Sequence, residues 1–207
     1  MKDYPEPRLP GPEAGPLPDP EARLFPDEIV RLTPDELKIA DEVGRARAAR
    51  ARRRQGYAPR FSGQNLERNN LLGARAELAA ARYFGLDDVP TVDYREHDLS
   101  IGWQVRSSSN PRGRLTLWIE DGRHALEVFV HVVPTATFSE AVVEYRVTGW
   151  LYGADVMREE YRDELGRHPS WSAPQRDLAP PASLLEYLVD EAYRAVRDPR
   201  PGDIADA

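Results

Sequence analysis

The stretch "DLSIGWQVRSSS" (residues 98–109) reads as a short β segment, a tight glycine turn and a second β segment that ends in serines. Side chains alternate along a strand, so Gln104 and Arg106 share one face and Val105 points the other way, toward a core. Asp98 offers a carboxylate, Gln104 a side-chain carbonyl and Val105 a main-chain carbonyl. Oxygen atoms of these kinds are the ligands that Mg²⁺ prefers. We therefore expect a divalent-cation site at this hairpin.

The segments around the hairpin predict an α/β (α+β) protein with a central mixed β-sheet flanked by helices. Segments rich in β-branched and aromatic residues are typical of strands. They cover residues 91–95, 98–102, 103–108, 114–120, 125–133 and 142–151. The run at 125–133 lacks alternation and predicts a central strand buried on both faces. Helical patterns cover residues 32–54, 70–85, 152–165 and 181–197, whereas residues 166–180 read as irregular.

Both helices before the hairpin carry recognisable ends. Thr33 is expected to cap the first helix, with Glu36 completing a capping box. Asn69 or Asn70 is expected to cap the second helix, and Gly85 to end it. Glu77 lies inside this second helix and can add a second carboxylate to the cation site from above.

The chain divides into three parts by composition. Residues 1–32 are rich in proline, glycine and acids, which favours an extended or disordered arm that can also lie across its own domain or a neighbouring subunit. Residues 33–197 carry the helical and β patterns and are expected to form one domain. Residues 198–207 are expected to form a flexible tail.

Composition narrows the classes of protein. The 207 residues contain no cysteine, which excludes disulfides and thiolate metal sites. No window approaches the roughly 20 apolar residues that span a bilayer, so no membrane partner is expected. A cytoplasmic setting is the expectation, and the sequence leaves a homo-oligomer open.

Charge is unevenly distributed. The net charge is −7, but residues 41–82 hold ten arginines against four acids, so that segment is +6 and the remainder −13. A basic face on an acidic protein is compatible with binding the phosphate backbone of a nucleic acid. A run of charged residues is also typical of a helix face exposed to solvent. The candidate nucleic-acid-binding residues are Arg50, Arg52, Arg53, Arg54, Ser107 and Ser108.

With these elements in order, the sequence resembles the PD-(D/E)XK nuclease superfamily, and within it small phage- and bacterium-encoded members. Gly73, Glu77 and Ala79 match a Gly-x-x-x-Glu-x-Ala helix. Asp98 matches the metal-binding aspartate before a turn, and residues 104–108 match the (Asp/Glu/Gln)-x-Lys strand with serine after it. An apolar strand and a strand ending in Gly-Trp follow, so the resemblance spans roughly residues 33–190.

The resemblance implies a restriction-endonuclease-like fold, a Mg²⁺ or Mn²⁺ ion and a nucleic-acid substrate. DNA is the expected substrate and a bacterial host cell the expected location. It implies that Asp98 is the principal metal ligand, that Gln104, Glu77 and the Val105 carbonyl complete the site, and that Arg106 takes the place of the catalytic lysine. Two departures weaken catalysis. Gln104 is neutral, and the Arg106 guanidinium stays protonated and cannot act as a general base.

Three functions remain open. The first is a metal-dependent nuclease that hydrolyses phosphodiester bonds. The second is an inactive nuclease-fold protein that binds nucleic acid. The third is a structural or interaction protein that works through its Pro-rich arm. Taken singly, the residues have ordinary interpretations. Asp98 suits a turn, Gln104 and Arg106 suit the solvent face of an edge strand, and Glu77 suits an exposed helix position paired with Arg75 or Arg82. His97 is expected to point away from the site.

Overall fold

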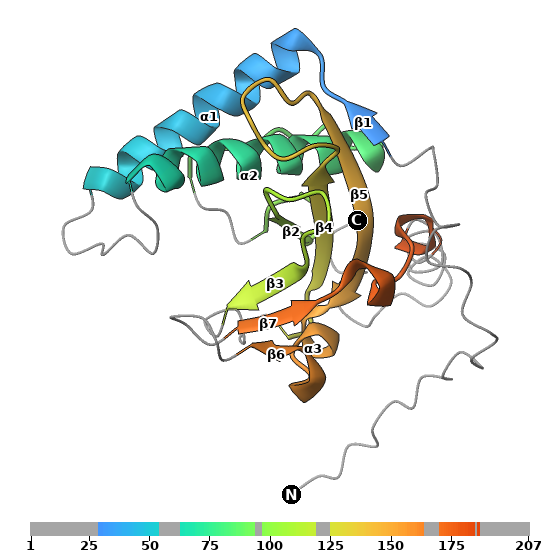
Figure 1. The fold of residues 1–207 in the computed structure, drawn as a ribbon. Helices are drawn as coiled ribbons and strands as arrows, with labels where there is room; N and C mark the ends of the chain where they lie inside the picture. The colour runs from blue at the N-terminus through green and yellow to red at the C-terminus, as the bar shows by residue number, and fades with distance from the viewer. Residues whose placement is uncertain are drawn as a thin grey trace, which may run out of the picture.

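The computed structural model describes residues 29–53, 63–93, 97–118, 125–163, 170–184 and 186. Within them the chain forms two long helices, a four-stranded mixed sheet and a three-stranded antiparallel sheet (Figure 1). The expectation of a mixed sheet combined with helices is therefore confirmed. The predicted arm up to residue 28, the predicted tail, Arg54 and most of the predicted C-terminal helix lie outside the described residues.

The larger sheet has the strand order β1-β5-β4-β2. Its strands are β1 Ile29–Arg31, β5 Glu144–Tyr152, β4 Val128–Pro134 and β2 Gln104–Ser107. β2 pairs with β4 in parallel, and the other pairs are antiparallel. Every residue of β4 is buried, so the predicted central strand is confirmed. β1 lies inside the region expected to be an arm and forms one edge of this sheet, and β2 forms the other.

The smaller sheet has the order β3-β7-β6. It consists of β3 Leu115–Trp118, β7 Ser170–Ala173 and β6 Arg162–Asp163, and β7 arises from a segment expected to be irregular. The 3-10 helix η4, Gln175–Asp177, follows β7.

The prediction of a helix over residues 152–165 is wrong. The chain instead forms the short helix α3 Gly153–Val156, the 3-10 helix η3 Glu159–Tyr161 and then β6. Val156 is fully buried in the core of the smaller sheet, and Met157 and Tyr161 pack against that core. Packing of these three side chains on the smaller sheet accompanies the break in the helix, so tertiary contacts override the helix propensity.

The β segments before β2 are also weaker than expected. Residues 91–93 form no strand, and residues 98–102 contribute only the isolated bridge between Leu99 and Trp103. The hairpin before β2 is therefore a tight loop, closed by hydrogen bonds from the Asp98 and Leu99 amides to the Trp103 carbonyl, both 3.1 Å.

Helix α1, Pro34–Arg53, begins at the predicted capping box. The Thr33 amide donates to Glu36 Oε2 at 2.9 Å, and the Glu36 amide donates to Thr33 Oγ1 at 3.3 Å. This confirms the predicted start of the helix.

Helix α2, Gly63–Tyr83, begins before Asn69 and Asn70, so the predicted caps are wrong. Asn70 lies inside the helix, where its amide group donates to the Leu66 carbonyl at 2.7 Å. The predicted end is confirmed, because Gly85 follows the helix with φ +68° and its amide donates to the Arg82 carbonyl.

Helix α2 lies against the larger sheet, and α1 packs on α2 (Figure 1). The two helices approach each other closely at Gly44, where a Cβ atom would lie 2.7 Å from the Leu71 Cα. Buried alanines of α2 allow it to pack tightly between α1 and the sheet. This packing places the inner face of α2, and with it Glu77, next to the edge strand β2.

Candidate functional site

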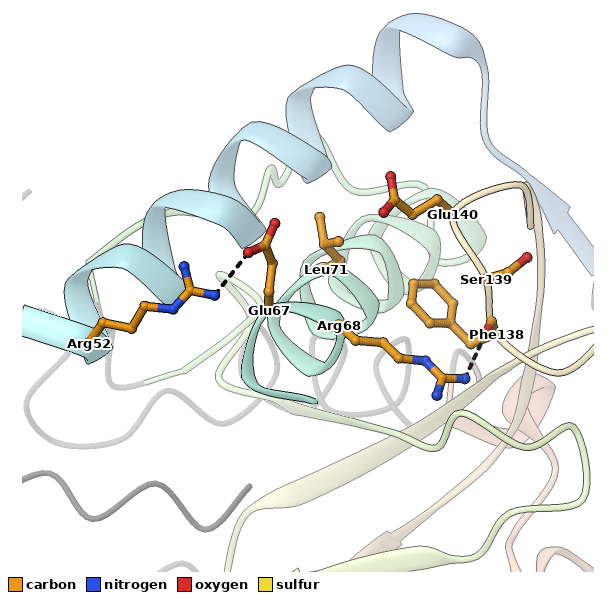
Figure 2. A pocket seen from close by; sticks show the side chains of 7 residues that line it. All are labelled: Arg52, Glu67, Arg68, Leu71, Phe138, Ser139 and Glu140. Carbon is orange, nitrogen blue, oxygen red and sulfur yellow. Dashed lines mark hydrogen bonds and ion pairs between the residues drawn. The ribbon is translucent and has the colours of Figure 1, made fainter. Parts of the chain in front are cut away.

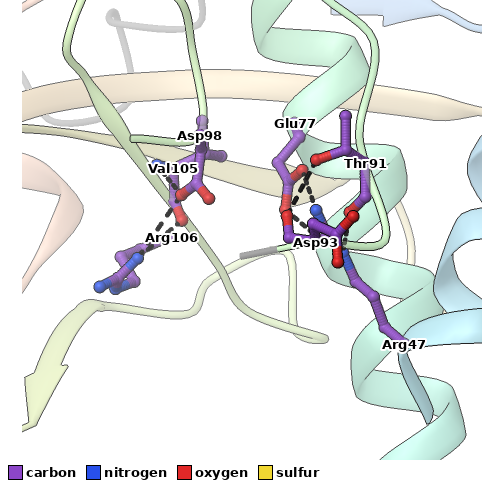
Figure 3. A network of polar contacts seen from close by, with 7 residues as sticks. All are labelled: Arg47, Glu77, Thr91, Asp93, Asp98, Val105 and Arg106. Atoms are coloured by element: carbon purple, nitrogen blue, oxygen red, sulfur yellow. Dashed lines mark hydrogen bonds and ion pairs between the residues drawn. The ribbon is translucent and has the colours of Figure 1, made fainter. Parts of the chain in front are cut away.

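A small cavity of about 150 Å³ lies where α1, α2 and the hairpin before β2 meet. Glu77 of α2, Asp98 of the hairpin, Val105 and Arg106 of β2 and Arg47 of α1 all line it. Figure 3 shows the side chains of these residues and the polar contacts between them. Four of the predicted site residues are thus brought together by elements that are distant in sequence.

Asp98 holds the edge of β2. Its Oδ2 atom accepts a hydrogen bond from the Val105 amide at 2.8 Å. β4 pairs with the other side of β2, so this carboxylate satisfies a backbone donor of an edge strand. Asp98 therefore stabilises the hairpin as well as facing the cavity.

The Arg106 guanidinium lies beside the two oxygen atoms expected to bind a metal ion. Its Nη1 atom donates to the Val105 carbonyl at 3.2 Å and lies 3.7 Å from Asp98 Oδ2. Its Cζ atom lies 5.0 Å from the centre of the Phe129 ring, a cation–π distance. The side chain is 26% exposed, so the positive charge remains accessible from the cavity.

Glu77 is paired in the interior rather than exposed. Arg47 donates from Nη1 to Glu77 Oε1 at 2.5 Å and from Nη2 to Oε2 at 2.8 Å. The Arg47 Nε atom also donates to the Thr91 carbonyl at 2.7 Å, which fixes the guanidinium. Glu77 is 7% exposed, so the interpretation as an exposed helix residue is wrong.

Burial raises the pKa of Glu77 to about 7, Arg47 opposes this rise, and the nearby charge of Asp98 adds to it. Desolvation disfavours the charged form of a carboxyl group. The alternative partners of Glu77 are engaged elsewhere, because Arg75 pairs with Asp41 at 2.6 Å and Arg82 with Glu36 at 2.5 Å.

Gln104 does not share this cavity. It is buried at the start of β2, and alternation along the strand places it on the face of Arg106, opposite Val105. Val105 packs in the core beneath α2, as expected. Among the residues that the structure describes, the cavity wall includes Val105 and Arg106 but not Gln104.

His97 lines the cavity beside Asp98, so the expectation that it points away is wrong. Residues 97 and 98 belong to no regular strand, and the alternation on which that expectation depended does not apply. The His97 Nδ1 atom lies 3.8 Å from Glu127 Oε2.

The arginines of the basic stretch are used largely in ion pairs. Arg50 pairs with Asp93, which also lines the cavity, and Arg52 pairs with Glu67 at 3.0 Å. Arg53 is exposed in the last turn of α1. Within the described part of this stretch, several of the positive charges are therefore paired with carboxylates.

The serines after β2 help to shape the following turn. Ser107 ends β2, and the Asn110 amide donates to Ser108 Oγ at 3.3 Å. Both serines are half-buried.

A second, larger cavity of about 500 Å³ lies beside α2 and the loop that precedes β5. Figure 2 shows Arg52 and Arg68 on its wall, with Arg68 donating to the Phe138 carbonyl at 2.7 Å. None of the predicted metal ligands lines this cavity.

A divalent cation does not fit the smaller cavity as it is arranged. The Asp98 and Val105 oxygens face Arg106, both Glu77 oxygens accept from Arg47, and Gln104 lies outside the wall. Mg²⁺ usually needs one or two carboxylates with open positions, and arginine contacts reduce the negative charge of those present.

Sequence reasoning did not identify Arg47, Thr91, Asp93 or His97 as cavity residues. One signal pointed toward Arg47, because a glutamate within an alanine-rich buried helix needs a cationic partner. Its identity depends on the packing of α1 on α2, which no local pattern reveals.

In the described part of the chain, no helix is long and apolar enough to cross a membrane. Comparisons with protein-family models, with curated proteins and with solved structures found no match for this chain.

Proposed function

We propose that this chain is a nuclease-like protein that binds nucleic acid, with DNA as the expected partner, at the cavity between Glu77 and Asp98. The proposal includes a restriction-endonuclease-like arrangement of the domain. The order of the elements supports it, because a helix carrying Glu77 packs beside a hairpin carrying Asp98 and an edge strand carrying Arg106.

The position of Arg106 carries this proposal. A guanidinium group presents donors in a planar fork that matches phosphate oxygens. Arg106 is held at the cavity by its contacts with Asp98, Val105 and Phe129, and it remains 26% exposed. A backbone phosphate that enters the cavity meets a cation that is already in place.

Two further arginines extend positive charge along the chain after β2. Arg112 and Arg114 are exposed in the segment that joins β2 to β3. Gln175 holds this segment by donating from Nε2 to the Pro111 and Gly113 carbonyls at 2.9 and 2.8 Å. An ordered segment costs less entropy on binding than one that must first be fixed.

The test is the affinity of the full chain for labelled single-stranded DNA, double-stranded DNA and RNA, measured by fluorescence anisotropy with EDTA present. Arg106→Gln should weaken binding by roughly 10- to 100-fold, the range for a lost charge-assisted hydrogen bond. It should also reduce the salt slope by about one. Arg158→Gln, an exposed arginine beside the smaller sheet, is the matched control. Equal affinities for the two variants and the unchanged protein would contradict the proposal.

Metal-dependent hydrolysis of DNA is the second candidate, and one observation favours it. The carboxylates of Glu77 and Asp98 line the same cavity, and the charge of Asp98 contributes to the raised pKa of Glu77. This function requires cleavage that depends on Mg²⁺ or Mn²⁺ and that is lost in Asp98→Asn. Intact DNA and RNA after incubation with both metals would exclude it.

A further inference from the structure

We infer that Arg106 takes the place of the divalent cation at Asp98 and Val105, so that the site is closed to metal ions while this side chain is present. The inference rests on the proposal that this cavity is the functional site. It concerns how the site acquires its positive charge, which is separate from whether nucleic acid binds there.

The first argument is the placement of one guanidinium nitrogen. The Arg106 Nη1 atom lies 3.2 Å from the Val105 carbonyl oxygen and 3.7 Å from Asp98 Oδ2. A metal ion bound by the same two oxygens would occupy the space beside Nη1. The ion and the guanidinium therefore compete for one position.

The second argument is that the guanidinium is held there. Its Cζ atom lies 5.0 Å from the Phe129 ring centre, and Phe129 is fully buried in the central strand β4. β2 and β4 pair in register, with Arg106 opposite His131, so the backbone that carries the side chain is fixed. An arginine stays protonated throughout the accessible pH range, so the charge cannot be titrated away.

The third argument is the balance of charge. Among the described residues, each carboxylate that lines the cavity has an arginine beside it: Glu77 with Arg47, Asp93 with Arg50, and Asp98 with Arg106. A divalent cation that enters adds two positive charges to a set in which each carboxyl group already has a cationic partner. Its entry becomes favourable only when one guanidinium is removed.

The inference predicts that Arg106→Gln opens the site to metal ions. Binding of Mn²⁺ to the full chain is measured by isothermal titration calorimetry, with no nucleic acid present. We expect no saturable binding to the unchanged protein and saturable binding to Arg106→Gln. Adding Asp98→Asn to that variant should remove the gain. Arg158→Gln serves as the control for the loss of one positive charge far from Asp98 along the chain.

Arg106→Met is the second variant, because its unbranched side chain keeps the packing on Phe129 if glutamine disturbs the fold. Circular dichroism identifies which variant is folded. Two results would overturn the inference: saturable Mn²⁺ binding to the unchanged protein that Asp98→Asn abolishes, or a folded Arg106 variant that gains no Mn²⁺ binding. The anisotropy measurement in EDTA tests nucleic-acid binding independently, so a failure there leaves the calorimetric result interpretable.

Discussion

Arg47 and Glu77 form a two-pronged ion pair between the two long helices, with N–O distances of 2.5 and 2.8 Å. The side chains are 15% and 9% exposed, so the pair is largely removed from water. Arg47 also binds the Thr91 carbonyl and so joins α1, α2 and the segment that leads to the hairpin. The geometry of the cavity depends on this contact.

Arg47→Met should lower the free energy of unfolding by about 3 kcal/mol, because it leaves a buried carboxylate without its partner. This loss is at the lower end of the roughly 3–5 kcal/mol that breaking a buried ion pair costs, because Glu77 can become protonated once Arg47 is absent. The pKa of Glu77 is already raised to about 7 by burial. Urea denaturation at pH 7 measures the change.

The double variant Arg47→Met, Glu77→Leu should recover much of that loss, because both charges are then absent from the interior. The exposed pair of Arg52 and Glu67 is the matched control, with side chains 50% and 39% exposed. Arg52→Met should cost less than about 1 kcal/mol. Similar losses at the two arginines would show that the Arg47 pair has no special role.

The close approach of the helices at Gly44 predicts a strong effect of a single methyl group. In Gly44→Ala the new Cβ would lie 2.7 Å from the Leu71 Cα and 2.9 Å from the Asn70 carbonyl oxygen. These are backbone atoms that cannot turn aside, so the helices must separate. We expect a loss of roughly 1–3 kcal/mol in urea denaturation, despite the higher helix propensity of alanine.

Gly73→Ala on α2 is the contrasting variant, because nothing lies within 4 Å of its added Cβ. Alanine should there raise stability by roughly 0.5–1 kcal/mol. A destabilised Gly73→Ala protein, or an unchanged Gly44→Ala protein, would contradict the described packing of α1 on α2.

Sequence patterns predicted the helices and strands that are determined by residues close to one another in the sequence. The capping box at Thr33 and Glu36 marks the start of α1 within one turn, and the apolar run of β4 marks a strand buried on both faces. The start of α2 was missed because residues 63–69 are largely polar and show no apolar periodicity. The turns after Tyr152 were missed because they depend on contacts of Val156 with the smaller sheet.

Some contacts of the candidate site are likewise local in sequence, and others depend on the packing of distant segments. The hairpin from Asp98 to Val105 is local in sequence, and its residues do meet at the cavity. Arg47 and Glu77 are 30 positions apart, and their pairing follows from the docking of two helices. The position of the Arg106 side chain depends on Phe129, which the sheet brings beside it from a distant segment.

His131 should make the stability of the protein depend on pH. It is fully buried in β4, and its Nδ1 atom lies 2.7 Å from Thr148 Oγ1. Desolvation lowers the pKa of His131 from 6.5 to about 3; the Arg114 backbone opposes this shift, and the charge of Arg146 adds to it. The unfolded chain therefore binds a proton before the folded protein does.

Because the folded pKa is depressed, this contribution to stability is present above pH 6.5 and is lost as the pH falls toward 3. By pH 5 the loss should reach about 2 kcal/mol. His131→Asn removes the titrating group. The unchanged protein and this variant should therefore differ in free energy of unfolding by about 2 kcal/mol less at pH 5 than at pH 7, as measured by urea denaturation. A difference that does not vary with pH would contradict a neutral buried imidazole.

Asp98→Asn distinguishes the two candidate functions by the sign of its effect on binding. The asparagine oxygen can still accept the hydrogen bond that the Val105 amide donates at 2.8 Å, so the hairpin should be retained. Removing the carboxylate 3.7 Å from Arg106 leaves that guanidinium without its acidic competitor for phosphate. We expect nucleic-acid affinity in EDTA to rise roughly fivefold, corresponding to about 1 kcal/mol. Asp98→Ala should also raise the nucleic-acid affinity. Because it removes the acceptor of the Val105 hydrogen bond as well, it should lower the melting temperature of the protein. In a metal-dependent nuclease Asp98 is instead required, and both variants would lose activity without any gain in metal-free binding.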